Sequence, residues 1–226
     1  EGIREMFRGI ILCSLLFSII QGTALASEDL PQVLDGLKKA YGHLDAISVP
    51  YTREVVTRSM SMLGTQAKGD LAGGTIYFRA PDLLRLEQEK PNIETIVANS
   101  ATMWWYIPDK KTAYEYKTEE FGKELRLMTN IFRGLAQVED NFKVTLHGKN
   151  SLGEYEMELI PSPPWEEIQK IEVMATDDYH IRTVKIHNLL GSVTIFTLGE
   201  FAEIHTLDKR FFTFTAPKGV KVIREK

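Results

Sequence analysis

The segment "LLRLEQEKPNIETIVANSATMWWYIPDKKTAYEYK" (residues 83–117) decides the fold, because its polar and apolar residues alternate in short runs. Leu84 and Leu86 share one face of the first run, while Leu83, Arg85 and Glu87 share the other. Turn residues separate the successive runs, at Lys90-Pro91-Asn92, Asn99-Ser100 and Pro108-Asp109. The segment therefore predicts an antiparallel meander with one dry and one wet face.

The run "TMWWYIP" (residues 102–108) is unusual because it is large and aromatic on both faces. Successive side chains of a strand point to opposite sides, so Trp104 and Trp105 cannot share a face. Met103 lies on the same face as Trp105, and Tyr106 lies on the same face as Trp104. We therefore expect that both sides of this strand are covered, either by protein or by a bound molecule.

Two amphipathic helices are expected beside the meander. The stretch "SEDLPQVLDGLKKAYGHL" (residues 27–44) begins with capping residues and Pro31, and it repeats apolar residues at spacings of three and four. The stretch "TEEFGKELRLMTNIFRGLAQ" (residues 118–137) has a Thr cap and the same spacing. Each helix has one apolar stripe that must pack on a sheet.

Strand patterns continue on both sides of the meander, from Ile47 onward and from Asn141 to a final "RFFTFTAP" (residues 210–217), for a total of about twelve strands. So many antiparallel strands must twist and curl. We expect a mainly β (α+β) fold: an unclosed antiparallel β-barrel, or strongly curved sheet, with helices covering its concave hydrophobic face. Nothing in the sequence marks a linker, so residues 27–226 are expected to form a single domain.

Composition narrows the class of protein. The chain has 226 residues, 43% of them apolar, with a net charge of -4 and a pI near 5.8. A nucleic-acid-binding surface would need a basic patch, which the sequence lacks. Nucleic acid is therefore excluded as an expected partner.

The N-terminal residues 1–26 resemble a cleaved secretory signal peptide. Arg4 and Arg8 precede the uncharged run "GIILCSLLFSII" (residues 9–20), and Ala24-Leu25-Ala26 supplies a small-x-small cleavage site. The run is shorter than the roughly 20 residues that span a bilayer. Cys13, the single cysteine, could instead be a lipidation site, but it lacks the small residues expected before it. Cleavage after Ala26 leaves a chain without thiols, so disulfides and cysteine catalysis are not expected.

No constellation in the sequence indicates catalysis. The five histidines are not at metal-ligand spacing, and no nucleophile elbow or phosphate-binding loop occurs. We expect no enzyme activity, no cofactor and no metal. Apolar residues stand out instead, including methionines that make an adaptable lining. Periodicity alone does not separate a filled core from a pocket for an apolar ligand.

"GGTIYFRAPDLLRLEQEKPNIETIVANSATMWWYIPDKKTAYEY" (residues 73–116) and the closing "FFTFTAPKGVKVIRE" (residues 211–225) resemble the LolA family of lipoprotein carriers. The resemblance implies a periplasmic protein that binds lipoprotein acyl chains in a hydrophobic cavity. Its expected partners are acylated lipoproteins, an inner-membrane ABC-type release complex and an outer-membrane acceptor, and it is expected to act as a monomer. A family member that only senses lipids or lipoproteins is the alternative, and a glycan hydrolase with a tryptophan platform is a weaker one.

The resemblance also places candidate residues in this cavity. By position, the lipid-binding candidates are Leu84, Leu86, Ile96, Met103, Trp105, Leu125, Met128 and Phe132. We expect Trp105 to face the cavity, and Trp104 to pack outside under a rim or a crossing segment. The family's lid latch is an arginine directly before a proline, but here Ala80 holds that position and Arg79 stands one earlier. One step along a strand reverses the side chain, so Arg79 is a candidate latch only if a bulge realigns it.

Overall fold

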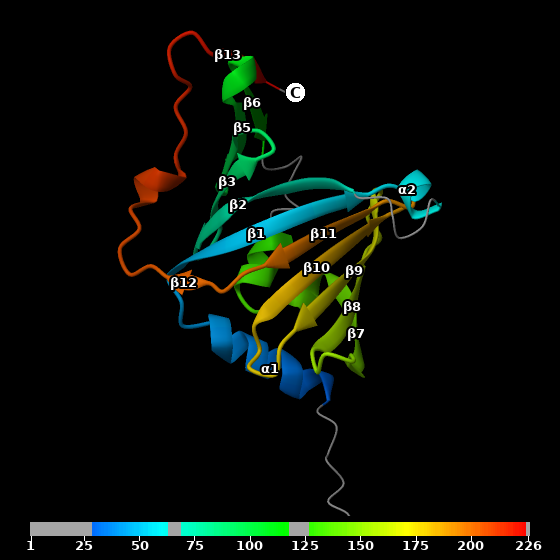
Figure 1. The fold of residues 1–226 in the computed structure, drawn as a ribbon. Coiled ribbons are helices and arrows are strands. Elements are labelled where there is room, and N and C mark those ends of the chain that lie inside the picture. The colour runs from blue at the N-terminus through cyan, green and yellow to red at the C-terminus, as the bar shows by residue number, and fades with distance from the viewer. Residues whose placement is uncertain (1–28, 63–68, 118–126, 225–226) are drawn as a thin grey trace, which may run out of the picture.

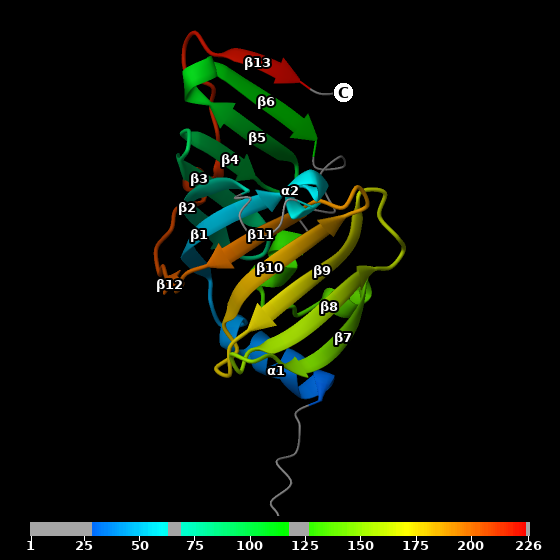
Figure 2. The same cartoon turned by 45° about the vertical axis from the view of Figure 1, so that its right-hand side comes forward.

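The fold is a large curved, mostly antiparallel sheet with helices inside its concave face, as a computed structural model describes it for residues 29–62, 69–117 and 127–224 (Figure 1). The expected signal peptide and Leu125 lie outside these described residues. Strands follow the order β13-β6-β5-β4-β3-β2-β1-β11-β10-β9-β8-β7, with the short β12 paired to β1. Among the described residues, β13 and β7 are the two edges of the sheet and do not pair with each other, which confirms the expected unclosed barrel (Figure 2).

The strands lie at the following bounds: β1 Ala46–Val56, β2 Asp70–Arg79, β3 Leu83–Lys90, β4 Glu94–Ala98, β5 Thr102–Ile107, β6 Thr112–Lys117, β7 Phe142–Lys149, β8 Tyr155–Pro161, β9 Ile168–Ala175, β10 Ile181–Asn188, β11 Val193–Leu198, β12 Ala202–Glu203 and β13 Lys221–Arg224. The helical elements with assigned bounds are α1 Leu30–Tyr41, α2 Arg58–Met62 and the 3-10 turns η1 Pro108–Lys110, η2 Val138–Asp140 and η3 Lys209–Phe212.

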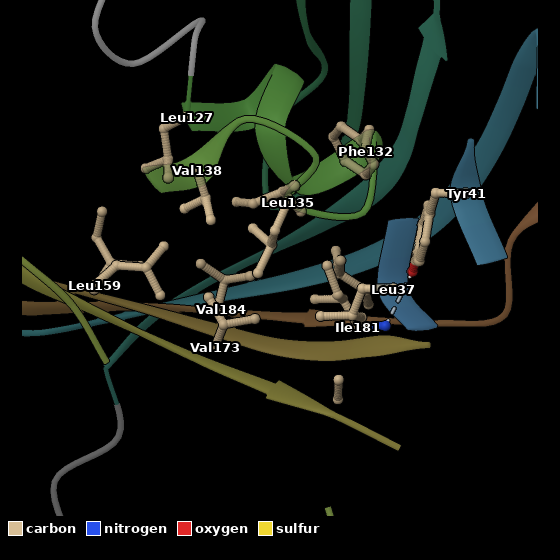
Figure 3. Close-up of a cluster of buried hydrophobic side chains, with 14 of the residues drawn as sticks. Leu37, Tyr41, Leu127, Phe132, Leu135, Val138, Leu159, Val173, Ile181 and Val184 are labelled. Carbon is tan, nitrogen blue, oxygen red and sulfur yellow. Dashed lines mark hydrogen bonds between the residues drawn. The ribbon is translucent and has the colours of Figure 1, made fainter. Parts of the chain in front are cut away.

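The first helix, α1, begins at Leu30, and Asp29 is its cap. The Asp29 carboxylate accepts a hydrogen bond from the Gln32 N–H, and the Gln32 side chain accepts one from the Asp29 N–H. Its buried stripe consists of Val33, Leu37 and Tyr41. This stripe packs against the sheet, as Figure 3 shows for Leu37 and Tyr41.

The second expected helix is shorter at its C-terminal end than the apolar spacing indicated. Residues 127–132 are helical, and the chain then turns at Gly134 and Leu135, which both have positive φ. The Leu135 N–H donates to the Asn130 carbonyl and the Gly134 N–H to the Ile131 carbonyl, which is a Schellman motif. A Cβ on Gly134 would lie 2.2 Å from the Leu37 carbonyl oxygen, so glycine lets this turn approach α1 closely.

The C-terminal segment corrects another expectation. Residues 210–217 were expected to form a strand, but they form the turn η3 followed by an extended stretch outside the sheet. This stretch runs along the convex side toward β13, which pairs with β6 in parallel (Figure 1). The spacing of the phenylalanines in this segment is typical of a strand. However, the segment packs its aromatic rings on the sheet, and its backbone does not pair with a strand. Phe211 contacts Tyr77, and Phe214 contacts Trp104.

Candidate functional site

The candidate site lies on the inner face of the meander formed by β3 to β6. The register places Leu86 opposite Ile96, and Ile96 opposite Trp105. Because directly opposed residues share a face, these three side chains form one row across the sheet. On the next row, Met103 lies opposite Ala98 and Tyr116.

A cavity of about 320 Å³ opens over these rows, and we call it the Trp105 pocket. Its lining is mainly apolar and aromatic, and consists of Arg53, Leu86, Gln88, Glu94, Ile96, Met103, Trp105, Tyr116 and Phe196. The volume is at the small end of the roughly 300–1,000 Å³ that ligand pockets occupy. Four expected cavity residues, Leu86, Ile96, Met103 and Trp105, thus lie together around one space.

Small residues on β2 leave room beside this pocket. Gly74 stands between Tyr51 of β1 and Gln88 of β3 in the register, and Ala72 stands opposite Arg53. The ladder shifts register at Gly73 and Gly74, and a Cβ on Gly74 would lie 1.9 Å from the Glu87 carbonyl oxygen. Glycine is therefore required at Gly74 for the two strands to approach each other.

A few polar side chains also line the pocket. The Trp105 indole Nε1 donates a hydrogen bond of 2.9 Å to Glu94 Oε2, and the Gln88 side chain donates to the Asn92 carbonyl. Tyr51 lies next to the pocket, and burial raises the pKa of its hydroxyl to about 12. The positive charge of Arg53 lowers the pKa of this hydroxyl, and the negative charge of Glu94 raises it further. Both charged groups therefore lie near the Tyr51 hydroxyl. The Trp105 ring also stacks on Tyr114 at 5.3 Å.

The outer face of the same strands is covered by the C-terminal segment. Phe214 lies 5.2 Å from Trp104 and 5.3 Å from Tyr106 between ring centroids. Phe211 packs on Tyr77, and its carbonyl accepts a hydrogen bond from Arg85. The two adjacent tryptophans therefore face different surroundings, Trp105 the pocket and Trp104 a crossing segment.

The remaining candidates lie deeper, in the hydrophobic core that includes the helix at 127–132. Phe132 is 3% exposed and stacks on Phe78, with ring centroids 5.6 Å apart. Leu84 is 6% exposed within the same core, and Met128 packs against it. These three residues do not line the Trp105 pocket.

Arg79 makes a different contact from the one expected of a latch. Its guanidinium donates to the Leu207 carbonyl at 2.6 Å and pairs with Asp45 at 3.3 Å. Its neighbour Phe78 faces the core, so Arg79 must face the convex side. Arg79 therefore ties the C-terminal segment to the outer face, on the side of the sheet away from the inner helix.

Sequence reasoning missed five residues of the lining, namely Arg53, Gln88, Glu94, Tyr116 and Phe196. The alternation of "ISVPYTREVV" could have identified Arg53, because it shares a face with Val49 and Tyr51, which are both buried. The position of Phe196 could not be found this way, since it depends on the pairing of β1 with β11.

Other kinds of site are not apparent in the described part of the chain. Among those residues, no group of three or more His, Asp, Glu or Cys side chains is placed to hold a metal ion. Among the same residues, no helix is both long and apolar enough to cross a membrane.

Comparisons with known proteins indicate the family and the fold of the chain. The family model described as "Outer membrane lipoprotein carrier protein LolA" matches residues 61–215, more than half of the chain. The outer-membrane lipoprotein carrier protein of Neisseria meningitidis serogroup B is 23% identical over 221 residues, which is 97% of each chain. The corresponding protein of Nitrosospira multiformis is 23% identical over 193 residues, covering 85% of this chain and 88% of that one.

A solved structure shows the same fold. An uncharacterized conserved protein from Thermus thermophilus superposes with a TM-score of 0.54 over 86% of this chain and 98% of that chain, at 13% identity. At this identity the similarity concerns the fold alone.

Proposed function

Because the chain belongs to the LolA family of outer membrane lipoprotein carrier proteins, we propose that it carries lipoproteins by binding their acyl chains in the Trp105 pocket. The carrier takes its cargo from an ABC-type release complex of the inner membrane, crosses the periplasm as a monomer, and delivers the cargo to an outer-membrane acceptor. It makes and breaks no bond in the cargo.

The observation that carries this proposal is an apolar pocket that the described residues leave open. Each CH₂ group that leaves water gains about 0.8 kcal/mol, so an acyl chain along Leu86, Ile96 and Met103 binds favourably. The small volume suits one chain better than several. The methionine adapts to chains of different shape, as flexible thioethers do.

The deeper candidates have a supporting role in this proposal. Phe132 and Leu84 belong to the hydrophobic core, and Met128 packs against that core. They meet the lipid only where a chain extends toward the helix at 127–132. Leu86, Ile96, Met103 and Trp105 are the primary contacts.

A second candidate function keeps the pocket but not the transfer. The protein could detect mislocalised lipoproteins or bind other lipids without carrying them. The contact between Arg79 and Leu207 favours this alternative, since the arginine that resembles the latch holds the outer segment instead.

A release assay separates the two functions. Purified protein added to spheroplasts with labelled lipoprotein in the inner membrane should release that lipoprotein as a soluble complex. Leu86→Glu should abolish release, whereas the control Leu71→Glu should not, because Leu71 is already 57% exposed. If the unaltered protein binds acyl chains but releases no lipoprotein, the carrier function would be contradicted and the lipid-binding function without transfer would be supported.

A further inference from the structure

An arginine faces into the apolar Trp105 pocket. Arg53 of β1 shares a face with Tyr51, which is 3% exposed, and it lies opposite Phe196 in the ladder between β1 and β11. Arg53 and Phe196 line the pocket on the side facing Leu86 and Trp105. A guanidinium in a mainly apolar wall is unusual, because burying a hydrogen-bond donor without an acceptor lowers the stability of the fold.

The donor atoms of Arg53 are not fully used. Its Nε is buried and has no hydrogen-bond partner among residues 29–62, 69–117 and 127–224. The nearby Tyr51 hydroxyl is likewise buried without a partner in the same residues. Arg53 lines the pocket, so its guanidinium places a donor group that is not fully paired beside an apolar wall.

A ligand in this pocket should offer the arginine a neutral hydrogen-bond acceptor rather than an anionic one. Glu94 lines the same pocket, and its carboxylate already accepts a hydrogen bond from Trp105. The negative charge of Glu94 offsets the positive charge of Arg53, and it would repel a second anion held in the same small space. An ester carbonyl accepts a hydrogen bond from an arginine without adding charge.

We propose that Arg53 donates a hydrogen bond to an ester carbonyl of an O-acylated ligand whose chain lies along Leu86, Ile96 and Met103. This inference rests on the proposed function, because it assumes that the pocket binds acyl chains. It adds that the pocket recognises where the chain is esterified. The pocket thereby distinguishes an O-acylated glyceryl group from an equally long hydrocarbon.

Quenching of Trp105 fluorescence by brominated chains measures this recognition directly. The ligands are a monoacylglycerol with a brominated chain and its 1-O-alkyl ether, which lacks only the carbonyl oxygen. A Trp105→Phe protein identifies the part of the signal that comes from the pocket. The unaltered protein should bind the ester roughly tenfold more tightly than the ether, as expected for a hydrogen bond to a charged donor.

Arg53→Met should remove that preference by weakening only the ester, while binding of the ether stays unchanged. Arg210→Met, on an exposed turn, is the matched control and should retain the preference. Equal binding of ester and ether by the unaltered protein would overturn the proposal even if Arg53→Met failed to fold. A preference that survives in folded Arg53→Met would also overturn it.

Two further outcomes separate this inference from its premise. A brominated fatty acid that binds more tightly than the ester would refute the neutral acceptor, because its carboxylate would then be favoured despite Glu94. The absence of Trp105 quenching by every ligand would refute acyl binding in this pocket, and with it the proposed function.

Discussion

The two halves of the concave face consist of similar alternating strands but are filled in different ways. In the half formed by β7 to β11, residues such as Leu159 and Val173 are 0% exposed under α1 and the helix at 127–132 (Figure 3). In the half formed by β3 to β6, Leu86 and Trp105 remain half-buried around a cavity. Helices that cover a sheet stabilise the fold, whereas the described residues leave a cavity over the inner face of β3 to β6.

Leu37→Ala tests the filled half and should have the largest effect on stability. Leu37 is 0% exposed on α1, so the change removes buried carbons and leaves a void. The free energy of unfolding should fall by about 2–5 kcal/mol, measured by urea denaturation. Acyl binding by the folded fraction should be unchanged. A loss of less than about 1 kcal/mol would mean that α1 is not part of the stabilising half.

Leu86→Glu tests the open half and should act on binding. A carboxylate in the pocket wall would lose hydration when an acyl chain binds, so affinity should fall roughly tenfold or more. Titration with a brominated acyl ligand gives the affinity, and Leu71→Glu is the exposed control. Unchanged affinity in folded Leu86→Glu would exclude Leu86 from the binding surface.

A matched pair of tyrosine substitutions sharpens the contrast. The Tyr41 hydroxyl accepts a hydrogen bond of 3.0 Å from the Ile181 N–H (Figure 3), so Tyr41→Phe leaves a buried donor without a partner. That change should cost about 1–3 kcal/mol. Tyr51→Phe should be nearly neutral or stabilising, because its hydroxyl has no partner among the described residues. Equal losses for the two variants, measured in urea, would contradict this difference.

Alkaline pH should reveal the burial of Tyr41. Burial raises the pKa of Tyr41 from 10.0 to about 12, so the folded state keeps a proton that the unfolded state loses. Stability is therefore fully present below pH 10 and declines between pH 10 and 12, by up to about 1.4 kcal/mol per pH unit. Tyr41→Phe should make this decline less steep. An identical slope in the variant would show that Tyr41 does not titrate in this way.

The sequence predicted the faces of the strands better than the coverings of those faces. Alternation separated Leu86 from Arg85 and Trp105 from Trp104, because the two sides of a strand are fixed by its backbone. It could not show that Phe214 covers Trp104, since that contact joins segments far apart in the chain. The same limit applies to Arg53, whose position opposite Phe196 depends on strand order.

The ends of elements were predicted less well for local reasons. Gly134 is itself a stop signal, and it ends the second helix before the apolar spacing does. The phenylalanines of residues 211–214 alternate as in a strand, although the segment contacts the sheet through its rings and a hydrogen bond from the Arg85 side chain rather than through strand pairing. Arg79 was assigned by resemblance, and the single-residue shift before Pro81 placed it on the convex side.

A photo-crosslinking amino acid introduced at Trp105 or at Trp104 tests the central claim most directly. The two positions are adjacent in β5 but face the pocket and the C-terminal segment, respectively. Irradiation of cells should yield adducts with acylated lipoproteins from position 105 and none from position 104. Equal adducts from both positions, or adducts from position 104 alone, would contradict an acyl-binding pocket on the inner face.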